Sequence, residues 1–271
     1  MTSSPHAAPA VPLPAVEVPL SRRRTVLALL LGVLLALAGA AVAHWLPRGW
    51  LLVVLLPAQL LLAVAWPALS GVPDRSATLL MSMGAALAAD LLLTVRTGPV
   101  FGALAGVLGI AVVATVLAQL VRRVRTEVTD VLAVQCSTVL LVVMISVLAA
   151  VRGLPSGRDA TTAGLLALAG ALAAGGVLDL LSVRFWLGPA AGGRTLLGAL
   201  VAVGVGAAVG AAVHGGDGLA AGVVAAALGV LGDLVVAVAA GTRRITRLLG
   251  AVLPFTLVGP GLYVVARVLF G

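Results

Sequence analysis

Three aspartates lie inside apolar stretches that are long enough to cross a lipid bilayer. They are Asp90, Asp179 and Asp233. A carboxylate at that depth is costly unless it faces the interior of a helical bundle, a polar partner or a water-filled cavity. Each of the three therefore marks a place where the chain could hold an ion, a headgroup or another helix.

The composition predicts that the apolar stretches are transmembrane helices. The chain has 271 residues, of which 62% are hydrophobic and 10% are charged. A helix needs about 20 residues to cross the bilayer core, and repeated runs of that length disfavour the short, alternating strands of a β-barrel. The net charge is +8, but the basic residues lie between apolar runs and aromatic residues make up only 3%. We therefore expect an all-α integral membrane protein that does not bind nucleic acid.

The apolar runs predict a bundle of about nine transmembrane helices. A tail rich in Pro, Ala and Ser, residues 1–21, precedes them and is predicted to be disordered and cytoplasmic. We divide the rest into N-terminal transmembrane helices, 22–129, and C-terminal transmembrane helices, 130–271. The expected spans are 25–43, 50–68, 78–95, 99–121, 130–151, 162–182, 196–213, 219–240 and 251–269.

The arginines predict the orientation. All 17 basic residues are Arg, and the chain has no Lys. With the N-terminus inside, 12 arginines fall on the inner side and five on the outer side, which is a strong positive-inside bias. We expect a multi-pass protein of the bacterial cytoplasmic membrane, with its N-terminus in the cytoplasm and its C-terminus outside.

Two of the aspartates lie toward the inner ends of their spans, close to loops that carry arginines. Carboxylates beside guanidinium groups could hold a divalent cation together with an anionic headgroup or phosphate. The same groups could instead pair with one another and fix the helices, and the sequence leaves both interpretations open. The candidate metal ligands are Asp179 and Asp233, and the candidate headgroup or phosphate ligands are Arg184, Arg194, Thr195, Arg243, Arg244 and Arg247.

Other features predict packing rather than chemistry. Asp90 lies nearer the outer side, where we expect local pairing or a hydrogen bond between helices. The glycine pairs Gly206/Gly210 and Gly218/Gly222 predict close approach of helix backbones. Residues 259–261, Gly-Pro-Gly, predict a kink or a re-entrant bend, and residues 242–249 have the pattern of a short interfacial helix.

A family resemblance follows from three short motifs. The segment 231–234, Leu-Gly-Asp-Leu, with a basic stretch and a last apolar run after it, resembles the C-terminal region of the phosphatidate cytidylyltransferase (CDP-diacylglycerol synthase) family. Residues 194–198, Arg-Thr-Leu-Leu-Gly, resemble that family's Lys-Thr-Trp-Glu-Gly motif, and Asp179 occupies the place of its Ser-Asp segment. Order, approximate spacing and the nine-span architecture agree over roughly residues 130–271, although the loop from Asp179 to Gly198 is shorter than in the family, and the resemblance implies a cytidylyltransferase-like fold.

The departures from that family concern its catalytic groups. The family signature continues with Lys, His and further Asp residues, whereas this chain has no acid after Asp233 and no Lys. Leu197 replaces the glutamate of the upstream motif. A cytidylyltransferase must bind the phosphates of CTP and a divalent metal while pyrophosphate leaves. The resemblance therefore implies the fold more than the activity.

Three functions remain as expectations. The first is a degenerate, non-catalytic relative of the cytidylyltransferases, without a cofactor. It would bind anionic phospholipid headgroups or a protein partner at the inner leaflet, and that partner would be a second copy of the chain in a homodimer or another membrane protein. The second is a divergent but active CTP-dependent enzyme of CDP-lipid synthesis that uses Mg²⁺. The third is a small-solute transporter, which rests only on the intramembrane acids.

Overall fold

The computed structural model describes residues 22–71, 75–95, 100–121, 128–180, 196–240 and 245–270, and the regular structure within these ranges is all helical. Each helix is long and apolar enough to cross a membrane. This confirms the predicted polytopic all-α membrane bundle. The helices are α1 (Arg22–Trp45), α2 (Arg48–Ser70), α3 (Arg75–Val95), α4 (Val100–Val121), α5 (Val128–Arg152), α6 (Gly157–Leu180), α7 (Leu196–Ala240) and α8 (Ile245–Phe270).

The outer surface of the bundle carries many large apolar side chains. Leu80, Leu91, Ile110 and Val268 each expose two thirds or more of their surface. A surface of this kind suits contact with lipid tails and would be a liability in water. Inside a bilayer the backbone must satisfy its own hydrogen bonds, and helices do so within each segment.

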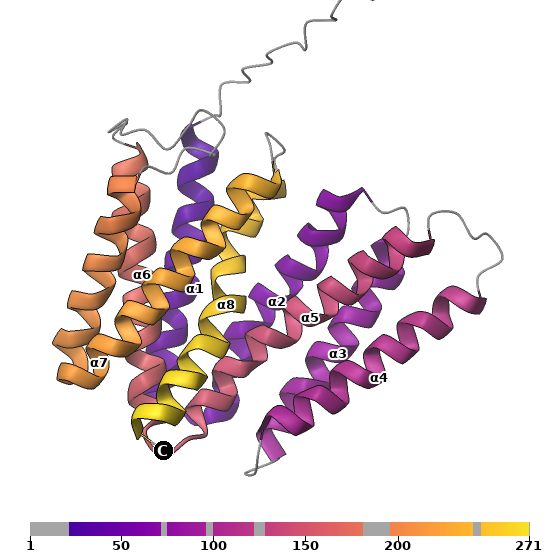
Figure 1. The fold of residues 1–271 in the computed structure, drawn as a ribbon, viewed down its shortest axis with the longest axis horizontal. Coiled ribbons are helices and arrows are strands. Elements are labelled where there is room, and N and C mark those ends of the chain that lie inside the picture. Colours follow the sequence, from indigo (N-terminus) through magenta and orange to yellow (C-terminus); the bar gives the residue numbers. More distant parts are fainter. Residues whose placement is uncertain are drawn as a thin grey trace, which may run out of the picture.

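The predicted spans 196–213 and 219–240 are the two halves of α7, which is sharply broken in its middle. His214 and Gly215 leave the helical conformation, and Gly215 has a positive φ of 64°. The break folds α7 into two arms, which Figure 1 shows as a hairpin at one side of the bundle. The described residues thus form eight labelled helices, and the two arms of α7 correspond to the seventh and eighth of the nine expected spans.

Glycines allow the two arms of α7 to touch along their backbones. A methyl group added to Gly210 would overlap the carbonyl oxygen of Gly218, and one added to Gly222 would lie 2.5 Å from the carbonyl oxygen of Gly206. The close packing predicted for the pairs Gly206/Gly210 and Gly218/Gly222 is confirmed. Both pairs face each other across one helical hairpin.

The helices α5 and α8 lie at the centre of the bundle (Figure 1). Helix α5 packs against α2, α3, α4 and α8, while α8 also packs against α1, α2 and α7. The helix α1 packs against α6, far along the chain. We call the end of the bundle at which α1 begins the Arg22 face, and the opposite end, at which α2 begins, the Arg48 face.

The helix α8 continues without a break through residues 259–261, so the predicted re-entrant bend is absent. A methyl group on Gly259 would lie 2.9 Å from the carbonyl oxygen of Met144 in α5. The glycine thus serves close packing between the two central helices. Residues 245–249 form the first turns of α8, and the predicted separate interfacial helix is wrong for that part; residues 242–244 lie outside the described residues.

Candidate functional site

The fold brings three of the predicted site residues to one end of the bundle. Asp179 is the next-to-last residue of α6, Asp233 lies in the second arm of α7, and Arg247 is the third residue of α8. The three helices pack against one another, and these ends lie at the Arg22 face (Figure 1). Asp233 is half-buried and already has an interaction partner.

The remaining predicted ligands fall in the connections between these helices. Arg184, Arg194, Thr195, Arg243 and Arg244 lie outside the described residues. For Asp179 and Arg247 the structure describes the backbone alone. The predicted grouping of carboxylates and arginines therefore stays a prediction at the level of side chains.

The glycine of the Leu-Gly-Asp-Leu segment has a packing role. A methyl group on Gly232 would lie 3.0 Å from the Cα atom of Pro254 in α8. Gly232 thus lets the second arm of α7 lie directly on α8, and Asp233 follows it in the sequence. This contact sets the position of Asp233 relative to α8.

The most completely described polar site lies elsewhere, between α2, α3 and α5. Asp90 in α3 is 5% exposed, and both Gln59 in α2 and Ser146 in α5 are fully buried. The Gln59 Nε2 amide donates to Asp90 Oδ1 at 3.3 Å and to Ser146 Oγ at 3.0 Å. The hydrogen bond between helices that was expected for Asp90 is confirmed. The partners Gln59 and Ser146 were missed.

A second layer of polar contacts between helices lies nearer the Arg22 face. Gln119 Nε2 in α4 donates to Gln135 Oε1 in α5 at 2.8 Å. Trp66 Nε1 in α2 donates to Ser137 Oγ in α5 at 2.9 Å. Such bonds hold transmembrane helices together where apolar surfaces alone give little preference over lipid. Together with the cluster of Gln59, Asp90 and Ser146, these bonds bring polar groups of α2, α3 and α4 against α5 in the part of the bundle that these four helices form.

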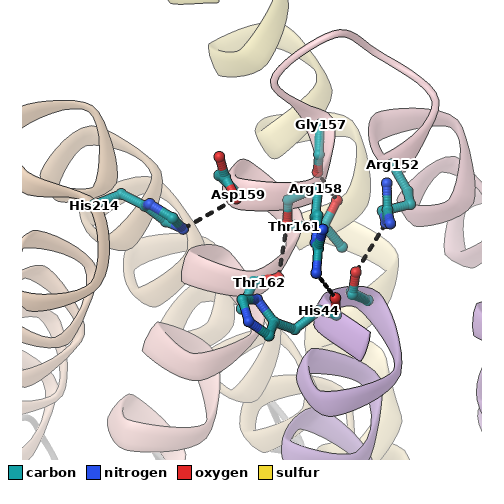
Figure 2. Close-up of polar contacts among 9 residues, drawn as sticks. His44, Arg152, Gly157, Arg158, Asp159, Thr161, Thr162 and His214 are labelled. Atoms are coloured by element: carbon teal, nitrogen blue, oxygen red, sulfur yellow. Dashed lines mark hydrogen bonds and ion pairs between the residues drawn. The ribbon is translucent and has the colours of Figure 1, made fainter. Parts of the chain in front are cut away.

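Arginines at the Arg48 face join the connection between α1 and α2 to the connection between α5 and α6. Arg152 Nε, at the end of α5, donates to the carbonyl oxygen of Ala43 at 2.9 Å, and Arg158 donates to the carbonyl oxygen of His44. Both carbonyl groups belong to the last turn of α1, and Figure 2 shows both contacts converging on it. In the other direction, Arg48 Nε donates to the carbonyl oxygen of Ala149 in α5 at 2.9 Å.

Each of these two connections thus supplies arginines to the C-terminal end of the helix that precedes the other connection, α1 or α5. The last carbonyl groups of a helix have no partner inside it and carry partial negative charge, so arginines stabilise them. We call Arg48, Arg152 and Arg158 the arginine latch. A weaker contact, 3.4 Å between His214 Nε2 and Asp159 Oδ1, joins the break in α7 to the start of α6 (Figure 2).

The latch explains three of the five arginines that were assigned to the outer side. From the sequence we interpreted them as determinants of topology, whereas here their guanidinium groups bind backbone oxygen atoms.

Within the described ranges, no group of three or more His, Cys, Asp or Glu side chains could hold a metal ion. No protein-family model, curated protein or solved structure matches the chain.

Proposed function

We propose that the protein is a non-catalytic membrane protein that binds an anionic phospholipid headgroup at the Arg22 face, beside the ends of α6, α7 and α8. One observation carries the proposal. Asp179, Asp233 and Arg247 lie on three mutually packed helices at the same end of the bundle. Packing of these helices against one another supports a shared site for the three residues.

The chemistry of these residues suits a phosphate ester. Arginine binds phosphate oxygen atoms through two parallel hydrogen bonds. Arg247 belongs to α8, and the connections that flank α7 supply four more arginines, Arg184, Arg194, Arg243 and Arg244. A basic residue near an anionic leaflet contributes about 1 kcal/mol of attraction. In this proposal the two aspartates orient the guanidinium groups.

The same residues support binding better than catalysis. Nucleotidyl transfer requires metal ions and cationic groups that stabilise the charge on the phosphates as pyrophosphate leaves. The chain has no Lys, and no acid follows Asp233. What the chain retains of the cytidylyltransferase pattern is sufficient to hold a headgroup. It lacks most of the groups that would position CTP and its metal.

The test is binding of a short-chain phosphatidate to protein in uncharged detergent micelles, measured by native mass spectrometry. Uncharged micelles remove the general attraction of an anionic surface. The triple variant Arg243→Gln/Arg244→Gln/Arg247→Gln should weaken binding at least tenfold, because it removes three cations from the site. The matched control is Arg122→Gln/Arg123→Gln/Arg125→Gln, which removes three cations from the connection between α4 and α5 and should change the affinity less than twofold.

Two results would count against the proposal. Equal weakening by both triple variants would show that the attraction depends on net charge rather than on a site. Release of pyrophosphate from CTP with Mg²⁺ and phosphatidate by the wild-type protein, lost in Asp233→Asn, would identify an active CDP-lipid synthase instead.

A further inference from the structure

The buried cluster of Gln59, Asp90 and Ser146 contains more hydrogen-bond acceptors than donors. The two protons of the Gln59 amide are both used, one toward Asp90 Oδ1 and one toward Ser146 Oγ. The second carboxylate oxygen, Asp90 Oδ2, and the amide oxygen, Gln59 Oε1, are buried and have no hydrogen-bond partner. The Ser146 hydroxyl group, which also interacts with Asp90, supplies only one more proton, and rotating the amide would turn its oxygen toward the carboxylate, so either orientation leaves an oxygen atom unsatisfied.

The cluster also lacks a counter-charge. Among the residues that the structure describes, no arginine or histidine forms an ion pair with Asp90. A buried carboxylate without a compensating charge is strongly disfavoured, and inside a membrane such residues commonly face an ion or another polar group. Three side chains from three separate helices, α2, α3 and α5, converge here, so the arrangement belongs to the tertiary fold.

We propose that Gln59, Asp90 and Ser146 form an intramembrane binding site for a monovalent metal cation such as Na⁺. The carboxylate, amide and hydroxyl groups supply the oxygen ligands that hard cations prefer. A single carboxylate carries one negative charge, which one monovalent cation neutralises. The ion would also satisfy Asp90 Oδ2 and Gln59 Oε1, the two oxygen atoms that lack partners.

A divalent ion fits the cluster less well. Binding of Ca²⁺ or Mg²⁺ by side chains usually draws on several carboxylates, or on phosphates of a substrate. Within the described ranges, no second acidic side chain joins Asp90 to make a metal-binding group. The charge and the ligand types therefore both favour a monovalent cation. This site lies in a different part of the bundle from the headgroup site and does not depend on it.

The test is titration of the purified protein in uncharged micelles with NaCl, with N-methyl-D-glucamine chloride used to keep ionic strength constant. Bound ²²Na⁺ and the thermal unfolding midpoint are measured together. We expect saturation at one Na⁺ per chain and a rise of the midpoint with Na⁺ concentration, because a ligand that binds only the folded state stabilises it. Asp90→Asn should weaken Na⁺ binding at least tenfold.

Two further variants make the result specific. Ser146→Ala keeps the carboxylate and removes one oxygen ligand, so it should fold and weaken Na⁺ binding at least threefold. Asp130→Asn removes an exposed acid from the same helix, α5, and should leave Na⁺ binding unchanged. Absence of saturable Na⁺ binding to the wild-type protein would overturn the proposal, since a proton or a water molecule would then satisfy the cluster. Full binding retained by Asp90→Asn or by Ser146→Ala would also overturn it.

Discussion

A single methyl group at Gly218 should force apart the two arms of α7. That group would overlap the carbonyl oxygen of Gly210 and would lie 3.0 Å from both the carbonyl carbon of Gly210 and the Cβ atom of His214. Because backbone atoms cannot rotate away as a side chain can, the arms must separate. Overpacking of this kind costs about 1–3 kcal/mol, and the higher helix propensity of alanine returns up to about 1 kcal/mol.

The expected result for Gly218→Ala is a lower free energy of unfolding, by up to about 2 kcal/mol once the full gain in helix propensity is subtracted. The matched control is Gly204→Ala in the first arm, where no atom lies within 4 Å of the added methyl group. There only the helix propensity changes, so the control should raise the free energy of unfolding by up to about 1 kcal/mol. The two substitutions are chemically identical, and they should change the free energy of unfolding in opposite directions.

The assay is reversible unfolding in mixed micelles with increasing SDS, followed by circular dichroism. The transition midpoint should fall for Gly218→Ala and should stay or rise for Gly204→Ala. If Gly218→Ala were as stable as Gly204→Ala, the backbone contact between the arms would not exist in solution, and the hairpin would have to be held by other residues.

Two further predictions concern the Arg48 face and the orientation. Arg48→Gln should lower the free energy of unfolding by about 1–3 kcal/mol, since it removes a charged hydrogen bond to Ala149. The control is Arg267→Gln, at an exposed residue near the end of α8, which should change the free energy of unfolding by less than about 0.5 kcal/mol in the same SDS assay. Equal effects of the two substitutions would argue against the arginine latch. A reporter fused after Arg125 should indicate the cytoplasm, and one inserted within 153–159 should indicate the outside. The reverse pattern would place the headgroup site at the outer leaflet and contradict the predicted orientation.

The helices were predictable because the bilayer imposes strong local requirements. A run of about 20 apolar residues can satisfy its backbone only as a helix, and this locates each element without knowledge of its neighbours. The sharpness of the turn between the two arms of α7 was not predictable in this way. Residues 214–218, His-Gly-Gly-Asp-Gly, have the composition of an ordinary loop, but only His214 and Gly215 leave the helical conformation.

The candidate sites depended on contacts between distant residues, and here the sequence was less informative. The depth of Asp90 indicated a polar partner, but Gln59 and Ser146 lie 31 and 56 residues away from it along the chain. Nothing in the local pattern distinguishes Gln59 from Gln119, which donates to Gln135 rather than to Asp90 or Ser146. The arginine latch was missed because its acceptors are backbone carbonyl groups, which no side-chain motif identifies.

The headgroup site is tested most directly by cryo-electron microscopy of the protein in nanodiscs that contain phosphatidate. We predict density for a headgroup phosphate at the Arg22 face, beside Arg247 at the start of α8 and close to the ends of α6 and α7. The same map from the variant Arg243→Gln/Arg244→Gln/Arg247→Gln should lack that density. A well-resolved wild-type map with no phosphate density at this end of α8, or with a bound headgroup only at other helices, would contradict the proposal.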